Sequence, residues 1–172
     1  NAQAMIFGLG AVLLWSTVAT AFSISLQHLS PTQLLVIASA ISLIFLLVLI
    51  TLKGDFSKLK QEAKQSWRAS LFFGAINPFL YYLILLQAYD MLPAQEAQAI
   101  NYTWAIVLSF MAVPILKQRL KGTDYIAAFA CYFGVLYIAT RGDLSELEFS
   151  NLPGVAFALF STFIWASYWL LN

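Results

Sequence analysis

The chain has 172 residues, of which 61% are hydrophobic, 16% aromatic and only 10% charged, and its formal net charge is +1. Soluble domains carry about 25% charged residues, so this composition argues against a soluble globular protein. A net charge close to zero gives no reason to expect nucleic acid as a partner. A bilayer core about 30 Å thick requires about 20 apolar residues per helix, and the chain contains several runs of that kind.

Six segments are predicted to cross the membrane as helices: 4–27, 31–52, 69–89, 97–116, 125–140 and 152–171. The fifth is short, and we expect the bilayer to adapt to it between Asp124 and Arg141. Membrane-spanning strands would alternate apolar and polar residues over about ten positions, which residues 41–50 do not do. We therefore predict an all-α integral membrane protein, a polytopic bundle of six transmembrane helices.

Proline and capping residues stand where these helices should begin. Ser30 and Pro31 open the second helix, Pro93 opens the fourth, and Asn151 and Pro153 open the sixth. Proline at the first helical position loses no hydrogen bond, because the first amide groups of a helix have no partner within it. Each of these positions therefore predicts a helix start.

Basic residues predict the orientation of the chain in the membrane. Eight of the nine Lys and Arg residues lie in two loops: Lys53, Lys58, Lys60, Lys64 and Arg68 in one, and Lys117, Arg119 and Lys121 in the other. Loops on the cytoplasmic side collect Lys and Arg. We therefore expect a multi-pass protein of the bacterial inner (plasma) membrane with a cytoplasmic N-terminus.

The first of these loops also repeats apolar residues at helical spacing. Phe56, Leu59, Ala63 and Trp67 would share one face of a helix, with lysines beside them. This pattern is typical of a short amphipathic helix lying on the inner leaflet. A solvated charged linker is the alternative.

A shift of 150 residues places the first segment over the sixth. Phe7 then matches Phe157, Leu9 matches Leu159 and Trp15 matches Trp165. Because the first segment starts inside and the sixth starts outside, two such five-helix units would be inverted relative to each other, as in many secondary transporters. We therefore expect a first repeat over residues 1–142. Residues 143–172 would be an outer loop and the first helix of a second, truncated repeat, which makes a missing second repeat or a homodimer the expected protein partner, beside the lipid bilayer.

Three tryptophans and two asparagines are expected near the bilayer midplane: Trp15, Trp104, Trp165, Asn77 and Asn101. Tryptophan usually collects at the membrane interfaces, whereas transporters bind substrate at the midplane. An amide without a partner in hydrocarbon costs several kcal/mol, so these amides should face protein or a cavity. Hydrogen bonding between packed helices is the alternative role for any single polar residue.

Two polar stripes extend this prediction along the first and fourth segments, with tyrosines of the third at similar depth. The predicted substrate-binding residues are Trp15, Ser16, Thr20, Asn77, Tyr81, Tyr82, Gln98, Asn101, Tyr102, Trp104 and Trp165. We expect them to form an outward-leading cavity with an aromatic, neutral floor. No charged residue lies inside the six predicted segments, and Glu96, near the outer surface, is expected to act as a helix-dipole partner.

Residues 71–142 resemble helices three to five of the EamA family in the drug/metabolite transporter superfamily. The matching features are "QAYDMLPAQEA" at the end of the third segment, "LKQRL" after the fourth, "YFGVLYI" in the fifth, and the Trp15-Ser16 and Ser30-Pro31 pairs. The run "NYTW" at residues 101–104 resembles the aromatic amino acid exporter branch, although Ala105 stands where that branch usually has proline. The resemblance implies a ten-helix transporter of small organic metabolites with inverted repeats.

The predicted function is a secondary transporter, an exporter or exchanger working by alternating access around a midplane cavity. The neutral aromatic and amide cluster favours amino acids with aromatic or apolar side chains as substrates. The alternatives are a non-transporting membrane fragment used for folding or assembly, and a cation exporter of the small multidrug pump type, whose first-helix glutamate is missing here. We expect no enzyme, cofactor or metal site, since His28 and Cys131 are the sole residues of their types.

Overall fold

The computed structural model describes residues 2–140, 142 and 151–172, and all the regular elements in these ranges are helical. They are α1 (Ala2–Leu26), α2 (Pro31–Leu52), α3 (Phe56–Gly74), the wide π-helical turn η1 (Ala75–Leu80), α4 (Tyr81–Met91), α5 (Ala94–Asn101), α6 (Trp104–Leu116), α7 (Gly122–Ala139) and α8 (Leu152–Leu171). Within the described ranges, five helical runs are long and apolar enough to cross a membrane, and α7 is a shorter apolar helix. The predicted all-helical polytopic membrane fold is confirmed, whereas most of the predicted outer loop lies outside the described residues.

Two predicted helix starts are confirmed by their hydrogen bonds. At α2, the Gln33 amide donates to Ser30 Oγ at 3.3 Å and the Ser30 amide donates to Gln33 Oε1 at 2.9 Å. At α8, the Gly154 amide donates to Asn151 Oδ1 at 3.0 Å. These bonds satisfy amide groups that the first turn of a helix leaves free.

The third helix begins earlier than predicted, and both the third and the fourth are interrupted in the structure. The helical run that contains the third begins at Phe56, so the amphipathic segment and the membrane span are continuous. Asn77 has non-helical backbone angles, φ −143° and ψ 119°, within η1. The fourth begins at Ala94, and a turn at Tyr102 and Thr103 separates α5 from α6. The interruption at Asn77 adjoins Pro78, a residue that predicts a kink, whereas the turn at Tyr102 and Thr103 lies in a run whose apolar composition predicts a uniform helix.

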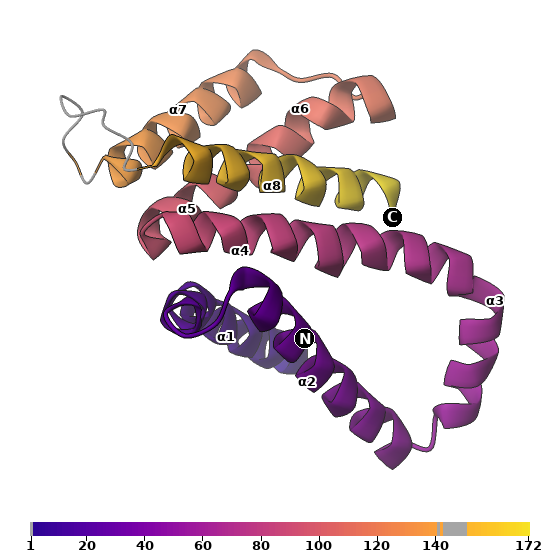
Figure 1. The fold of residues 1–172 in the computed structure, drawn as a ribbon. Helices are drawn as coiled ribbons and strands as arrows, with labels where there is room; N and C mark the ends of the chain where they lie inside the picture. Colours follow the sequence, from indigo (N-terminus) through magenta and orange to yellow (C-terminus); the bar gives the residue numbers. More distant parts are fainter. Residues whose placement is uncertain (1, 141, 143–150) are drawn as a thin grey trace.

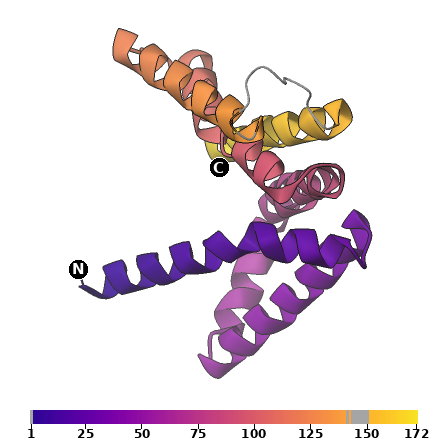
Figure 2. The same cartoon turned by 90° about the vertical axis from the view of Figure 1, so that its left-hand side faces the viewer.

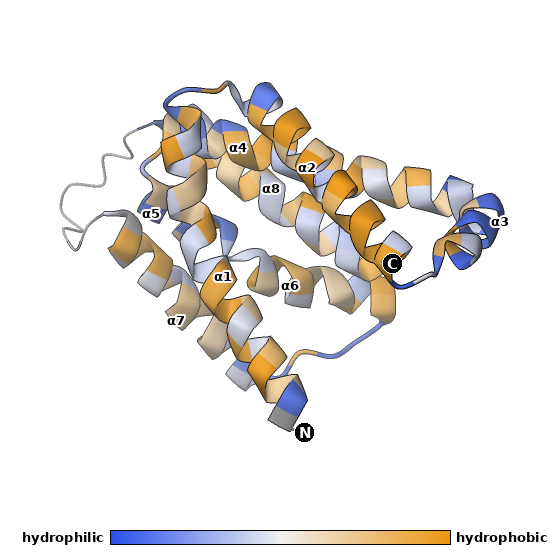
Figure 3. Ribbon diagram, turned by 90° about the horizontal axis from the view of Figure 1, so that it is seen from below, coloured by the Kyte–Doolittle hydropathy of each residue, from blue (hydrophilic) through white to orange (hydrophobic). Residues whose placement is uncertain are grey.

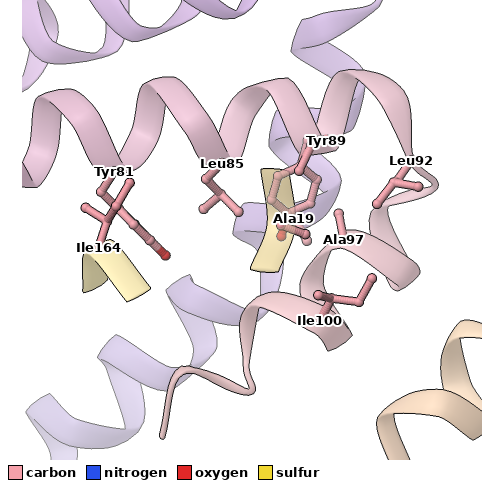
Figure 4. Packing of buried hydrophobic residues seen from close by; sticks show 10 residues of the cluster. Ala19, Tyr81, Leu85, Tyr89, Leu92, Ala97, Ile100 and Ile164 are labelled. Carbon is pink, nitrogen blue, oxygen red and sulfur yellow. The ribbon is translucent and has the colours of Figure 1, made fainter. Parts of the chain in front are cut away.

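The core of the fold is the contact between α4 and α8, which run side by side (Figure 1). Small residues permit this close approach, since Ala88 of α4 and Ala158 of α8 are fully buried in the shared core. Membrane helices pack through such small residues because lipid is as apolar as their larger side chains, so association depends on close contact. Figure 4 shows Ala19 of α1 and Ala97 of α5 beside the larger Leu85 and Tyr89 of α4.

The outer helices leave much apolar surface uncovered. The N-terminal half of α1 extends away from the other helices in Figure 2, and its Phe7 is 76% exposed. Phe129 of α7 is exposed to the same extent. In a membrane, lipid chains contact such faces without cost, because hydrocarbon replaces hydrocarbon.

We expect replacement of Gly154 by alanine to destabilise the fold. A Cβ atom at Gly154 would lie 2.8 Å from Leu92 Cγ and 3.0 Å from Met91 Cβ, so the beginning of α8 would have to move away from α4. Overpacking of this kind costs about 1–3 kcal/mol. Thermal unfolding in detergent should show a lower midpoint for Gly154→Ala than for the parent protein.

The matched control for this prediction is Gly134→Ala on α7. Nothing lies within 4 Å of a Cβ atom built at Gly134, and alanine favours helix over glycine by about 1 kcal/mol. Its unfolding midpoint should therefore equal or exceed that of the parent. Equal midpoints for both variants would show that α8 does not depend on this contact.

Candidate functional site

A cavity of about 410 Å³ lies between α1, α4, the α5–α6 turn and α8. This volume falls within the range of small-molecule sites, about 300–1,000 Å³. The residues that line it are Trp15, Val18, Ala19, Phe22, Tyr81, Tyr82, Leu85, Tyr89, Gln98, Asn101, Tyr102, Trp104, Ala105 and Trp165. The lining is therefore mainly aromatic, and its two carboxamides, Gln98 and Asn101, both belong to α5.

The structure brings most of the predicted site residues together around this cavity. Those that line it are Trp15, Tyr81, Tyr82, Gln98, Asn101, Tyr102, Trp104 and Trp165. They come from four segments far apart in the sequence, so the cavity exists only in the folded chain. The three tryptophans predicted at mid-depth, Trp15, Trp104 and Trp165, therefore meet at one cavity.

Three predicted residues, Ser16, Thr20 and Asn77, do not line the cavity. Ser16 and Thr20 are exposed on α1, and the Ser16 hydroxyl donates to the carbonyl of Leu13 at 2.7 Å. A hydroxyl that bonds to its own helix has no need of a polar cavity. Asn77 lies in η1, one helical turn before Tyr81.

Sequence reasoning missed several lining residues. The apolar face of α1 that carries Val18, Ala19 and Phe22 points to the cavity, in place of the neighbouring polar stripe. Tyr89 also lines it, seven residues after Tyr82 on the same helix. That spacing places both tyrosines on one helical face, so the sequence already indicated that Tyr89 lies on the same side as Tyr82. The Phe22 ring packs edge-on against both, with centroids 6.0 Å and 5.6 Å away.

Asn101 connects three helices by hydrogen bonds. The Tyr81 hydroxyl of α4 donates to Asn101 Oδ1 at 3.2 Å, and Asn101 Nδ2 donates to Ser161 Oγ of α8 at 2.9 Å. The Ser161 hydroxyl in turn donates to the Ala158 carbonyl at 2.6 Å. Asn101 is 5% exposed and Ser161 is fully buried. These bonds offset the cost of burying the amide in the membrane, and they connect three walls of the cavity.

The turn between α5 and α6 places its neighbouring side chains at the cavity. The Thr103 amide donates to the Ile100 carbonyl at 3.1 Å, and the Thr103 hydroxyl donates to the same oxygen at 2.7 Å. This tight turn lets both Tyr102 and Trp104 line the cavity. Gln98 Nε2 donates to the Tyr102 hydroxyl at 2.9 Å, which leaves the Gln98 carbonyl oxygen and the Tyr102 proton for other partners.

Trp165 is the centre of an aromatic cluster beside the cavity. Its ring lies 4.5 Å from that of Tyr81 and 6.2 Å from that of Trp104, between centroids. The cluster continues along α8 to Tyr168 and Trp169. Such tilted and edge-on contacts stabilise packing beyond the buried area. Trp165 Nε1 is buried and has no hydrogen-bond partner in the described part of the chain.

No lining residue that the structure describes carries a charge. Glu96, in the first turn of α5, is buried but does not line the cavity. Among the residues described, no three His, Cys, Asp or Glu side chains come together as metal ligands would. The arrangement provides aromatic surface and neutral hydrogen-bonding groups, which suit binding and reorientation of a small organic molecule.

Comparison with known proteins identifies one family. The sequence profile of the EamA-like transporter family matches residues 2–140. No curated protein and no solved structure matches the chain significantly. The matched range covers α1 to α7 and contains every lining residue of the cavity except Trp165.

We expect Ser161→Ala to weaken the helix bundle without changing the cavity lining. The substitution removes the acceptor of the Asn101 amide, and interhelical hydrogen bonds in membranes contribute about 0.6–1.7 kcal/mol. The free energy of unfolding, measured by denaturant titration in micelles, should fall by that amount.

Ser109→Ala is the control for this measurement. Its hydroxyl donates to Ala105 of its own helix at 2.8 Å, so its loss should change the free energy of unfolding by less than about 0.5 kcal/mol. Equal losses for the two variants would contradict the bridging role of Asn101.

Proposed function

The chain belongs to the EamA-like transporter family, a family of membrane transporters, and we propose that it is a secondary transporter of small organic metabolites. It acts as an exporter or exchanger by alternating access around the cavity. The observation that carries this proposal is the convergence of Trp15, Trp104 and Trp165 with Asn101 at one cavity of about 410 Å³. Hydrophobic and aromatic linings with few placed polar groups are typical of small-molecule sites.

The neutral aromatic lining favours amino acids with aromatic or apolar side chains as substrates. Tyr82, Tyr89 and Trp104 provide ring surfaces for an apolar side chain, because aromatic groups stack at little entropic cost. Gln98 and Tyr102 provide hydrogen-bonding groups for the polar end of the substrate. A carboxylate that would bind an organic cation is not among the described lining residues, which supports this proposal over a cation exporter.

Two interrupted helices adjoin the cavity and support alternating access. Asn77 breaks the regular backbone one turn before Tyr81, and the Tyr102–Thr103 turn separates α5 from α6. Transporters commonly build their sites from discontinuous helices. We propose that the two halves on either side of these interruptions rotate when the cavity changes the side to which it opens.

We further propose that residues 1–142 form one repeat and that α8 begins a second, inverted repeat. Support comes from Trp15 and Trp165, the matched tryptophans of the two, which line the same cavity. Trp15 is 68% exposed and Tyr102 is 57% exposed, so this side of the cavity is open. The remainder of a second repeat would close it, and a second copy of the chain is the alternative.

Trp104→Ala is expected to reduce substrate affinity. The truncation removes one ring of the cavity wall, and loss of an aromatic contact of about 1.4 kcal/mol corresponds to about tenfold in affinity. Labelled phenylalanine should therefore bind about tenfold more weakly to the variant, and its efflux from vesicles that contain the protein should slow.

Phe129→Ala is the control, because Phe129 lies outside the cavity on α7 and is 76% exposed. Its phenylalanine binding should equal that of the parent. Unchanged binding in Trp104→Ala would remove Trp104 from the site. Absence of saturable binding of any aromatic or apolar amino acid to the parent protein would refute the proposed substrate class.

We also propose that the N-terminus is cytoplasmic in the inner membrane, as the basic loops predict. In a Cys131→Ala background, a membrane-impermeant thiol reagent added outside intact cells should label Gln95→Cys and leave Lys121→Cys unlabelled. Cell lysis should then expose Lys121→Cys. The opposite labelling pattern would invert the assignment.

A further inference from the structure

Helix α3 (Phe56–Gly74) is the most hydrophilic helix of the fold and contributes none of the lining of the cavity. Figure 3 shows hydrophilic residues concentrated on it, in contrast to the mostly apolar α2. None of its residues is buried. The segment 53–68 carries five cations and two acids. The cations are Lys53, Lys58, Lys60, Lys64 and Arg68, and the acids are Asp55 and Glu62. The segment therefore has a net positive charge that the proposed transport function does not use.

The same helix carries an apolar stripe that is mostly exposed, with Leu59 half-buried. Phe56, Leu59, Ala63 and Trp67 follow steps of three, four and four residues, so they share one helical face. Phe56 and Trp67 are each 56% exposed. An uncovered apolar stripe of this kind requires an apolar partner outside the protein.

The N-terminal part of α3 lies across the direction of the membrane-spanning helices. Figures 1 and 2 show its N-terminal part running at a steep angle to α4, which runs beside the membrane-spanning α8. The guanidinium of Arg68 lies 5.4 Å from the centroid of the Trp67 ring. Tryptophan and arginine at a membrane interface keep an apolar body in the lipid and a polar end in the headgroup layer.

We propose that residues 56–68 form a binding surface for the headgroups of anionic phospholipids, with the apolar stripe immersed in the same leaflet. Lys58 is paired with Asp55 at 2.7 Å, so Lys60, Lys64 and Arg68 are the cations assigned to the lipid phosphates. Each cation near an anionic leaflet contributes to binding. A soluble acidic protein or a nucleic acid would match these charges but would leave the apolar stripe exposed, which is why lipid is the occupant.

This surface has a structural consequence for the rest of the chain. α3 continues through η1 into α4 without a loop, and α4 carries Tyr81, the hydroxyl of which bonds Asn101. Docking of α3 on the leaflet thus sets the direction from which this helical run enters the bilayer.

The depth of α3 in vesicles tests this proposal. In the full chain with Cys131→Ala, a spin label is placed at Leu59→Cys on the stripe or at Gln65→Cys on the opposite face. Access of each label to oxygen, which concentrates in lipid, and to a water-soluble nickel chelate is then measured. Vesicles are made of phosphatidylcholine alone or with phosphatidylglycerol.

The label at residue 59 should favour oxygen and the label at residue 65 should favour nickel. This difference should be larger with phosphatidylglycerol and should shrink at high salt, because salt screens charges near the surface. The double variant Lys60→Glu/Lys64→Glu should lose the dependence on phosphatidylglycerol. The control Arg119→Glu/Lys121→Glu, in the other basic loop, should retain it.

Two results would overturn the proposal. Equal nickel access at residues 59 and 65 would show that α3 is a solvated linker. Immersion that is the same in both lipids and at all salt concentrations would show that headgroup charge takes no part. The lipid and salt comparisons use the native charges of α3, so they remain decisive even if the glutamate variants fold poorly.

Discussion

The hydrogen bonds of the Asn101 carboxamide hold the centre of this fold together. Asn101 accepts from Tyr81 on α4 and donates to Ser161 on α8, and no water is available inside a bilayer to replace either partner. The amide therefore selects the one arrangement of α4, α5 and α8 in which both bonds form. Alanines in the core between α4 and α8 permit it, since larger residues at Ala88 or Ala158 would separate the helices.

The cavity is a consequence of this arrangement. Once α4 and α8 are held at close contact, the rings of Tyr81 and Trp165 pack against each other at a tilt and line the cavity. The turn after Asn101 then directs Tyr102 and Trp104 toward the same space. A wall made by α4, α5, α6 and α8 thus faces α1, which packs less extensively against the other helices.

The periphery has a different physical basis from the core. α1 and α7 present apolar residues to lipid, whereas the N-terminal part of α3 combines an apolar stripe with cations and lies across the direction of α4. In the interior, hydrogen bonds and small residues determine how the helices pack, because lipid is as apolar as the side chains and does not drive the helices together. At the surface, charge and the boundary between lipid headgroups and acyl chains determine where an amphipathic helix lies.

The sequence by itself determined the helical membrane fold, the helix starts at Ser30 and Asn151, and the family, because length, hydropathy and capping are local properties. It also identified Asn101, Trp104 and Trp165, since a carboxamide or an indole at mid-depth requires a protein partner or a cavity. It assigned Ser16 and Thr20 to the cavity, which the structure lines with Val18 and Phe22 instead. Polarity did not indicate which side of α1 faces the cavity, because the hydroxyl of Ser16 bonds to a carbonyl of its own helix. Only the tertiary structure decided which face of α1 meets α4, because that choice depends on how closely side chains from distant segments fit together.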